Sequence, residues 1–252
     1  MKSIALITLS AGVAAMLGIS ACNKTTSEAS KSNSGGATST APSGQDAKIA
    51  DKALVRFINA TPTAKDLYFG DVTAFSNVGA EAVSTYSELP AQRHEFKLFD
   101  AGTNGGSPLA TNSESPSAGQ HYTVVAMNSV NGSTILDPVS DDLSAPEAGK
   151  AKVRVIHAAP GVSKVDIYPA GSKKAILDGI AFKDATSYKD VDPVVTEIDV
   201  RTEGNKESAV TIHNVTLQPG KLYTLLLMGG NGEPLTSKVI EDQLIQSVAS
   251  IR

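Results

Sequence analysis

Short runs of apolar residues, broken by polar positions and bounded by turn-forming residues, recur along the chain from residue 50 onward. Residues 198–202, IDVRT, alternate strictly between apolar and polar side chains, as on a strand with one buried face. Gly, Pro and Asn mark the turns between the runs, which is typical of antiparallel strands joined by hairpins. We find no convincing long amphipathic helix. The predicted strands are 54–58, 66–69, 95–99, 121–127 and 133–136, followed by 153–156, 165–168, 197–201, 209–215, 222–228 and 237–240.

This pattern occurs twice because part of the chain is duplicated. Residues 52–68 are KALVRFINATPTAKDLY and residues 150–168 are KAKVRVIHAAPGVSKVDIY. The matches lie roughly 100 residues apart, which is the size of an independent domain and too long for a solenoid unit. The corresponding pairs include Arg56 and Arg154, Pro62 and Pro160, Asp66 and Asp166, Tyr68 and Tyr168, Tyr86 and Tyr188, Gly119 and Gly220, Tyr122 and Tyr223, Thr123 and Thr224, and Met127 and Met228.

The strand spacing predicts the fold of each copy. Six to eight short strands in about 95 residues are typical of a β-sandwich. Residues 217–223, LQPGKLY, resemble the tyrosine corner of immunoglobulin-like sandwiches, in which a Tyr hydroxyl bonds to upstream backbone, and residues 119–122 are a looser version. Tyr122 and Tyr223 are therefore predicted to stabilise the fold rather than to bind a ligand. The fold class is predicted to be all-β, with two tandem immunoglobulin-like sandwich domains at 50–138 and 150–252 and a linker at 139–149.

The N-terminal region has the pattern of an export signal. Lys2 precedes a mostly apolar run at 4–19, which is too short to span a bilayer as a helix. The segment ends Gly-Ile-Ser-Ala21-Cys22 and resembles the lipobox of bacterial lipoproteins. That resemblance implies a signal peptide at 1–21, cleavage between Ala21 and Cys22, and lipid attachment at Cys22, with a membrane contact through the acyl chains. The alternative is an ordinary signal peptide that happens to end near a Cys.

The residues after Cys22 bear on where the protein is held. Asn23 stands where Asp would favour retention at the inner membrane in the lipoproteins that the signal resembles, so we expect an outer-membrane lipoprotein of the cell envelope. Residues 22–49 are rich in Ser, Thr, Gly and Ala and have almost no large apolar side chain, which predicts a disordered tether. The tether is either a spacer or a passive remnant. Leu244, Ile245, Val248 and Ile251 would give a short C-terminal helix one apolar face.

The Arg-bearing first strand, the Ala-x-Pro turn and the Asp-apolar-Tyr element together resemble the bacterial domain-of-unknown-function family 4397, whose members are exported and often carry tandem copies. The resemblance covers about residues 52–240, and His157 to Pro160 matches the turn of the family better than Asn59 to Pro62 does. It implies an immunoglobulin-like fold and brings no assigned chemistry.

Composition narrows the range of partners. The net charge is −4 and dispersed, which argues against nucleic acid because that partner needs a clustered basic face. The one Cys leaves no intramolecular disulfide, and the absence of Trp with six Tyr and six Phe argues against aromatic platforms for sugars and against base-stacking surfaces.

The titratable residues do not assemble into a catalytic or metal-binding motif. His94, His121, His157 and His213 lack metal-ligand spacing, and no Gly-x-Ser-x-Gly, phosphate loop or His-Glu-x-x-His is present. His157 stands where the first copy has Asn59, so we expect a turn residue that bonds nearby backbone. Asp66 and Asp166 are expected to be structural as well. The last group, expected to be solvated loop charges, is Asp141, Asp142, Glu241 and Asp242.

These observations favour a lipid-anchored envelope protein that acts as a non-catalytic binding or adhesion module. We expect no cofactor and no metal, and an unknown protein or glycan partner on loops or sheet edges. Duplication favours binding because two linked modules raise avidity. The alternatives are a structural spacer or assembly component of the envelope and, less favoured, an enzyme.

Overall fold

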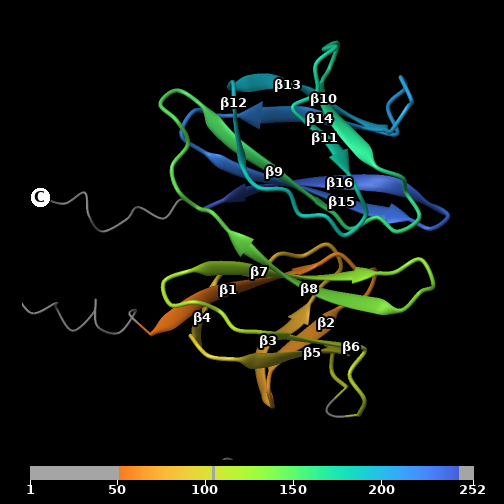
Figure 1. The fold of residues 1–252 in the computed structure, drawn as a ribbon. Coiled ribbons are helices and arrows are strands. Elements are labelled where there is room, and N and C mark those ends of the chain that lie inside the picture. Colours follow the sequence, from red (N-terminus) through yellow and green to blue (C-terminus); the bar gives the residue numbers. More distant parts are fainter. Residues whose placement is uncertain (1–50, 104–105, 244–252) are drawn as a thin grey trace, which may run out of the picture. The chain divides into compact units, whose positions relative to one another are not determined.

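The computed structural model describes residues 51–103 and 106–243, and all of its regular elements are strands (Figure 1). Within those residues no helix is long and apolar enough to cross a membrane. The strands of the first repeat are β1 Lys52–Asn59, β2 Lys65–Phe69, β3 Val72–Val78, β4 Ser87–Pro90, β5 His94–Asp100, β6 Ala110–Glu114, β7 His121–Asn128 and β8 Thr134–Asp141. Those of the second are β9 Ala151–His157, β10 Val165–Pro169, β11 Leu177–Ile180, β12 Lys189–Val191, β13 Val194–Thr202, β14 Val210–Leu217, β15 Leu222–Gly230 and β16 Glu233–Asp242.

Each repeat is a sandwich of two four-stranded sheets (Figure 1). The first repeat has the orders β4-β1-β7-β8 and β3-β2-β5-β6, and the second has β12-β9-β15-β16 and β11-β10-β13-β14. The two orders correspond strand by strand, which confirms the predicted duplication and the all-β sandwich fold. The pairing is not wholly antiparallel, however, because β1 runs parallel to β7 and β9 runs parallel to β15.

The parallel pairs lie at the centre of their sheets and are covered on both faces. Every residue of β9 is buried, and so are all but one of the residues of β15. β15 has the near-continuous apolar run that is typical of strands covered on both sides, whereas β9 buries Lys152, Arg154 and His157 along with its apolar residues. The long connection between β1 and β7 permits the parallel arrangement, which no tight hairpin could form.

Three hydrophobic clusters occupy the faces of these sheets. One lies inside the first sandwich and includes Phe57, Phe96 and Leu98, and a second lies inside the second sandwich. The third combines residues of both repeats, with Ile58 and Met127 from the first packed with Leu226 and others from the second. The outer faces of β1, β7, β9 and β15 therefore form a core of their own, which is why these strands are buried on both sides.

The strands that the sequence pattern did not predict have few buried residues. They are β3, β4 and β6 in the first repeat and β11 and β12 in the second, and most of the residues in β4 are exposed. Such strands lack the apolar alternation on which the prediction depended.

The segment between the repeats is short and anchored. β8 continues to Asp141, inside the predicted linker 139–149. Beyond it, Lys152 pairs with Asp142 at 3.2 Å and donates to the Ser144 hydroxyl at 2.7 Å, while Leu143 is buried. The predicted signal peptide, tether and C-terminal helix lie outside the described residues.

Candidate functional site

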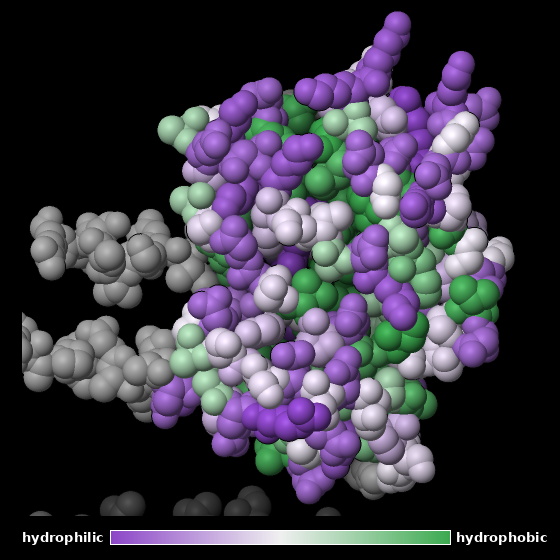
Figure 2. Space-filling view, in the orientation of Figure 1, coloured by the Kyte–Doolittle hydropathy of each residue, from purple (hydrophilic) through white to green (hydrophobic). Residues whose placement is uncertain are grey.

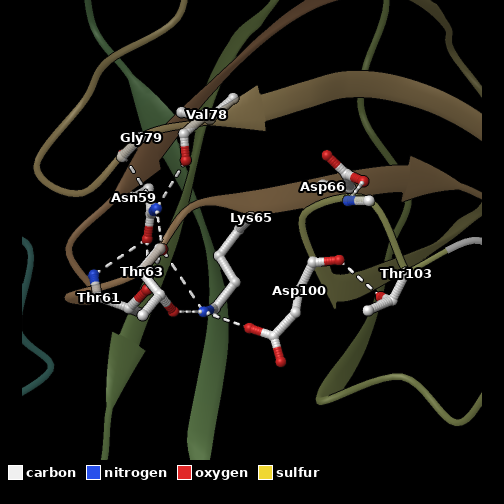
Figure 3. A network of polar contacts seen from close by, with 10 residues as sticks. Asn59, Thr61, Thr63, Lys65, Asp66, Val78, Gly79, Asp100 and Thr103 are labelled. Carbon is white, nitrogen blue, oxygen red and sulfur yellow. Dashed lines mark hydrogen bonds and ion pairs between the residues drawn. The ribbon is translucent and has the colours of Figure 1, made fainter.

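The turn after the first strand is held by the same contact in both repeats, although the residues differ, and Figure 3 shows it in the first repeat. Asn59 Oδ1 accepts hydrogen bonds from the Thr61 backbone N–H at 3.0 Å and the Thr61 hydroxyl at 2.7 Å. His157 Nδ1 accepts from the Ala159 backbone N–H at 3.3 Å, also two residues ahead. His157 is fully buried, and burial lowers its pKa. The prediction of a backbone-bonding turn residue is confirmed.

Below this turn the first repeat adds an ion pair that the second lacks (Figure 3). Lys65, which is buried, reaches Asp100 at 2.9 Å and also bonds Thr63. Val165 has the corresponding place in β10, opposite Thr202. The pair fixes one end of the β2–β5 pairing and engages a lysine that would otherwise be a candidate ligand contact.

Asp66 and Asp166 each anchor a bulged edge strand. Asp66 Oδ1 accepts from the Asn77 N–H at 2.6 Å and Oδ2 from the Gly102 N–H at 3.0 Å. Asp166 Oδ1 accepts from the Gly179 N–H at 2.8 Å. Asn77 and Gly179 both have positive φ, at 50° and 65°, where the strand departs from regular pairing. Both aspartates are thus structural, as predicted.

The two predicted tyrosine corners are present. The Tyr223 hydroxyl accepts from the Gln218 N–H at 3.1 Å, and the Tyr122 hydroxyl accepts from the Ser117 N–H at 3.1 Å. Each bond ties the start of a central strand to the turn before it, which confirms that these side chains stabilise the fold.

A buried polar network joins the repeats through paired positions. Arg56 forms an ion pair with Asp242 at 2.7 Å, and Arg154 forms one with Asp141 at 2.7 Å. Each arginine therefore crosses to the carboxylate of the other repeat. All four side chains are almost fully enclosed, with no more than 4% of any exposed.

Each carboxylate is also bonded within its own repeat. Tyr86 donates to Asp141 at 2.6 Å, and Tyr188 donates to Asp242 at 2.7 Å. The remaining contacts follow the same twofold pattern. Thr123 donates to Asp141 and accepts from Arg56 Nε, and Thr224 in the same way donates to Asp242 and accepts from Arg154 Nε. The guanidinium group of Arg56 lies over the Tyr86 ring at 5.1 Å, and that of Arg154 lies over the Tyr188 ring at 4.6 Å.

This network corrects one sequence prediction. Asp141 and Asp242 are buried, whereas Asp142 and Glu241 remain half-exposed or more and pair with lysines. Strand alternation explains the difference, since neighbouring residues of a strand point to opposite faces. The paired positions of Asp141 and Asp242 in the duplication were a signal that could have identified them.

The pKa shifts of the tyrosines and of Arg56 in the buried network are those of an enclosed structural cluster. Burial, with the nearby Asp141 carboxylate, raises the pKa of Tyr86 far above its usual value, and burial raises the pKa of Tyr188 similarly. Both phenols stay protonated and act as donors. Burial works to lower the pKa of Arg56, but Asp242 and Asp141 more than offset this, so its pKa is raised and its charge is kept.

The other histidines are dispersed. His94 Nε2 lies 2.8 Å from the Pro90 carbonyl, His213 pairs with Glu197 at 2.6 Å, and His121 stacks on Tyr86 at 5.4 Å. Burial lowers the pKa of His121, partly opposed by Asp141. Among the residues that the structure describes, no three His, Cys, Asp or Glu side chains are placed to hold a metal ion. Ala21 and Cys22 lie outside those residues.

One concavity on the outer face of the first sandwich is lined by groups that a ligand could contact. It has a volume of about 420 Å³ and lies over β2, β5 and β6. Tyr68 and Phe99 meet edge to face in it, with ring centroids 5.0 Å apart. Lys97 lies beside them and pairs with Asp71 at 2.9 Å and Glu95 at 3.5 Å. Sequence reasoning missed this site because its residues come from separate strands and turns that no local motif connects, and they converge through strand pairing such as that of Tyr68 with Lys97.

The second repeat has different residues at the same place. Arg201 corresponds to Phe99, and Asp199 corresponds to Lys97, by their pairing with β10 and β2. The guanidinium of Arg201 lies over the Tyr168 ring at 4.3 Å and pairs with Asp199 at 3.0 Å. The tyrosine face is thus covered by the protein itself.

The family model of the domain of unknown function DUF4397 matches residues 53–168 and 151–250. The chain belongs to the DUF4397 family. The first DUF4397 match contains Arg56, Tyr86, Thr123 and Asp141, and the second contains their counterparts, so both halves of the buried network lie within the family region.

Solved structures similar to the DUF4397 region are distant. The C-terminal domain of AlgF from P. aeruginosa is 21% identical, with 37% of this chain and 99% of that chain covered and a TM-score of 0.31. A family CBM26 module of Eubacterium rectale Amy13K, solved with maltoheptaose, is 11% identical, with 76% and 97% covered and a TM-score of 0.22. Both TM-scores are low, so neither likeness bears on what this chain does. No curated protein matches the sequence significantly.

Proposed function

We propose that this protein is a lipid-anchored envelope protein that binds a partner without catalysis, through the concavity beside Tyr68. The sequence around Cys22 supports the anchor. The observation that carries the binding proposal is the placement of Tyr68 and Phe99 on an outward sheet face, next to Lys97, Asp71 and Glu95. A concave surface with rings and a few converging polar groups is the usual form of a binding site.

The distribution of polar groups supports binding over catalysis. His157, Asp66 and Asp166 hold backbone groups, and the Arg56 and Arg154 clusters are enclosed. A catalytic group must lie within hydrogen-bond reach of a reacting atom. These groups are already engaged with the protein itself, whereas the concavity presents side chains outward.

Apolar contact over a broad surface is less well supported. The exposed large apolar side chains among the described residues are three: Val72, Leu109 and Val130. On the face drawn in Figure 2, hydrophobic residues are interspersed with hydrophilic ones. Stable protein interfaces usually have a contiguous apolar centre, so a small, partly polar ligand fits this surface better.

The second candidate function is a structural spacer. The third hydrophobic cluster and the crossed ion pairs connect the repeats, as a stiff spacer would require. A spacer has no saturable ligand, and this distinguishes it from a binding module.

Binding is tested with the full chain in detergent and the envelope fraction of the host. We expect saturable retention that is weakened at least tenfold by Tyr68→Ala. Tyr168→Ala is the matched control, since Arg201 already covers that ring. Retention that never saturates, or that both variants reduce equally, would favour the spacer.

Catalysis is tested on the same protein with ester, peptide, glycoside and phosphate reporters, with and without divalent metals. We expect no turnover above a blank. Turnover that disappears on His157→Asn or Asp166→Asn would establish an enzyme and reject the non-catalytic proposal.

The anchor gives a separate prediction. Cys22→Ser removes the only thiol of the chain and leaves no atom for a thioether, so both lipid attachment and cleavage should stop. Detergent-phase partitioning should then be lost from the mature form, as measured by phase separation and mass spectrometry of the N-terminus. A variant that matures and partitions normally would show that Cys22 is not the anchor.

A further inference from the structure

We propose that the concavity formed by Tyr68, Phe99 and Lys97 binds a neutral oligosaccharide. The inference rests on the proposed binding function and names its ligand class. It depends on three features of the surface: the rings, the order of the charges around them, and the different state of the same place in the second repeat.

The rings provide an apolar contact of limited width. Tyr68 and Phe99 belong to the neighbouring strands β2 and β5, and their planes are inclined at 70°. The composition argued against aromatic platforms for sugars, and the present proposal departs from that expectation because two rings meet on this face. The pair can contact the C–H face of about one sugar ring, because aromatic side chains combine a large apolar area with few rotatable bonds. The volume of about 420 Å³ lies within the range of small-molecule sites.

The charges around the rings alternate in sign. Lys97 lies between Asp71 and Glu95, and its side chain is paired with both. Hydrogen bonding to Asp71 raises the pKa of Lys97, so the ammonium group persists. An anionic ligand would meet two carboxylates. The carboxylates outnumber the ammonium group and would attract a cationic peptide, but Lys97, which is paired with both of them, would oppose it.

A neutral polyhydroxyl ligand suits this alternation. Each hydroxyl group both donates and accepts a hydrogen bond, so it can donate to Asp71 or Glu95 and accept from Lys97. Thr111 lies opposite Lys97 on β6 and adds another hydroxyl on the exposed side of the concavity. Charged partners strengthen such bonds relative to neutral ones, and this helps a ligand that carries no charge of its own.

The second repeat supports the assignment by contrast. Arg201 covers the Tyr168 ring and pairs with Asp199, and Thr211 also donates to Asp199 at 3.1 Å. The charged groups pair with one another in both repeats, but only in the second does a charged side chain, Arg201, lie over the tyrosine ring, whereas Tyr68 meets Phe99 edge to face. The chain therefore has one open copy of this surface and one copy that is occupied by its own side chain, which provides an internal control.

The experiment uses the full chain in detergent and isothermal titration calorimetry. The probes are neutral gluco-, manno-, xylo-, galacto- and N-acetylglucosamine oligosaccharides of four to six units, oligogalacturonate, oligolysine and oligoglutamate. We expect at least one neutral oligosaccharide to bind, with an affinity that changes less than twofold between low and high salt, because no net charge is neutralised.

The variants locate the site. Tyr68→Ala should weaken binding at least tenfold and Tyr168→Ala less than twofold. Thr111→Arg places a long side chain at an exposed position and should block the concavity even if Tyr68→Ala fails to fold, which thermal unfolding followed by circular dichroism would reveal.

The possible outcomes distinguish an error in the ligand class from an error in the location of the binding surface. Binding of oligolysine or oligoglutamate that requires Tyr68, with no neutral saccharide bound, overturns the saccharide inference and leaves the binding surface in place. No binding of any probe also overturns the inference, and the envelope-fraction assay then decides whether the surface binds anything. Saccharide binding that Thr111→Arg does not affect places the site elsewhere and overturns it too.

Discussion

At the scale of single residues, the same turn position is occupied by an asparagine in one repeat and by a histidine in the other. Asn59 and His157 each accept a hydrogen bond from the backbone N–H two residues ahead, one through an amide oxygen and the other through a ring nitrogen. Only the histidine can take up a proton in the range near neutral pH. The second repeat therefore has a pH dependence at this turn that the first repeat lacks.

Acid should destabilise the protein through His157. Its pKa is lowered by burial, so the unfolded chain binds a proton that the folded chain excludes, and stability present above about pH 6.5 is lost as the pH falls below that value. His157→Asn, which copies the first repeat, should reduce this loss between pH 7.5 and 5.5, as measured by urea unfolding. His121 contributes to the remainder, since its pKa is also lowered, and His121→Leu copies Leu222 as the matched control. An unchanged pH profile in His157→Asn would contradict this account.

Much of this residue-scale picture could be predicted from the sequence. The tyrosine corners and the turn role of His157 follow from short local motifs, and their contacts span only a few residues. The structural role of Asp66 was expected from its place at a strand start, but its bonds to Asn77 and Gly102 join separate segments of the chain. Asp141 and Asp242 could not be placed in this way. Their partners Arg154 and Arg56 come from the other repeat, and a run of acidic residues at a strand end gives no sign of that.

At the scale of elements, the repeats differ in how firmly an edge strand is attached. Asp66 holds two backbone N–H groups, at the bulge of β3 and after β5, whereas Asp166 holds the single bulge contact to Gly179. Asp66 is also the more buried of the two.

The loss of these carboxylates should therefore be unequal. Asp66→Ala should lower the free energy of unfolding by about 2–4 kcal/mol and Asp166→Ala by about 1–2 kcal/mol. Asp66 loses two part-buried bonds and Asp166 loses one exposed bond, and a hydrogen bond to a charged group contributes about 1.5–3 kcal/mol when shielded and less when exposed to water. Chemical unfolding monitored by circular dichroism measures both. Equal losses would mean that the Gly102 contact adds nothing.

The strands that sequence reasoning found and missed differ by burial. Central strands such as β9 and β15 are fully or almost fully buried and are evident in the sequence, while β4 and β12 are short and have one buried residue between them. The concavity beside Tyr68 was missed for a related reason. It depends on the register that sets Lys97 between Tyr68 and Thr111, and register is a property of strand pairing rather than of any one segment.

At the scale of the whole molecule, the buried network makes each repeat a condition for the stability of the other. Arg56→Met should cost about 3–5 kcal/mol, because Asp242 is left as an uncompensated buried charge. Adding Asp242→Asn should recover more than about 1 kcal/mol, since the amide oxygen still accepts from Tyr188 and no charge remains. Urea unfolding of the two single variants and the double variant provides the measurement. Additive losses would show that the pair is not coupled.

The crossed ion pairs also bear on how the contact between the repeats depends on protein concentration. Each repeat carries both an arginine and an aspartate, so the contact surface is self-complementary, like that of a twofold homodimer. Two separate copies would dissociate at low protein concentration, because their association would depend on concentration. Here the few anchored residues between Asp141 and Ala151 keep the local concentration of each half high at any abundance. The paired state therefore survives in a single molecule, and it would persist in a protein spread thinly over a cell surface.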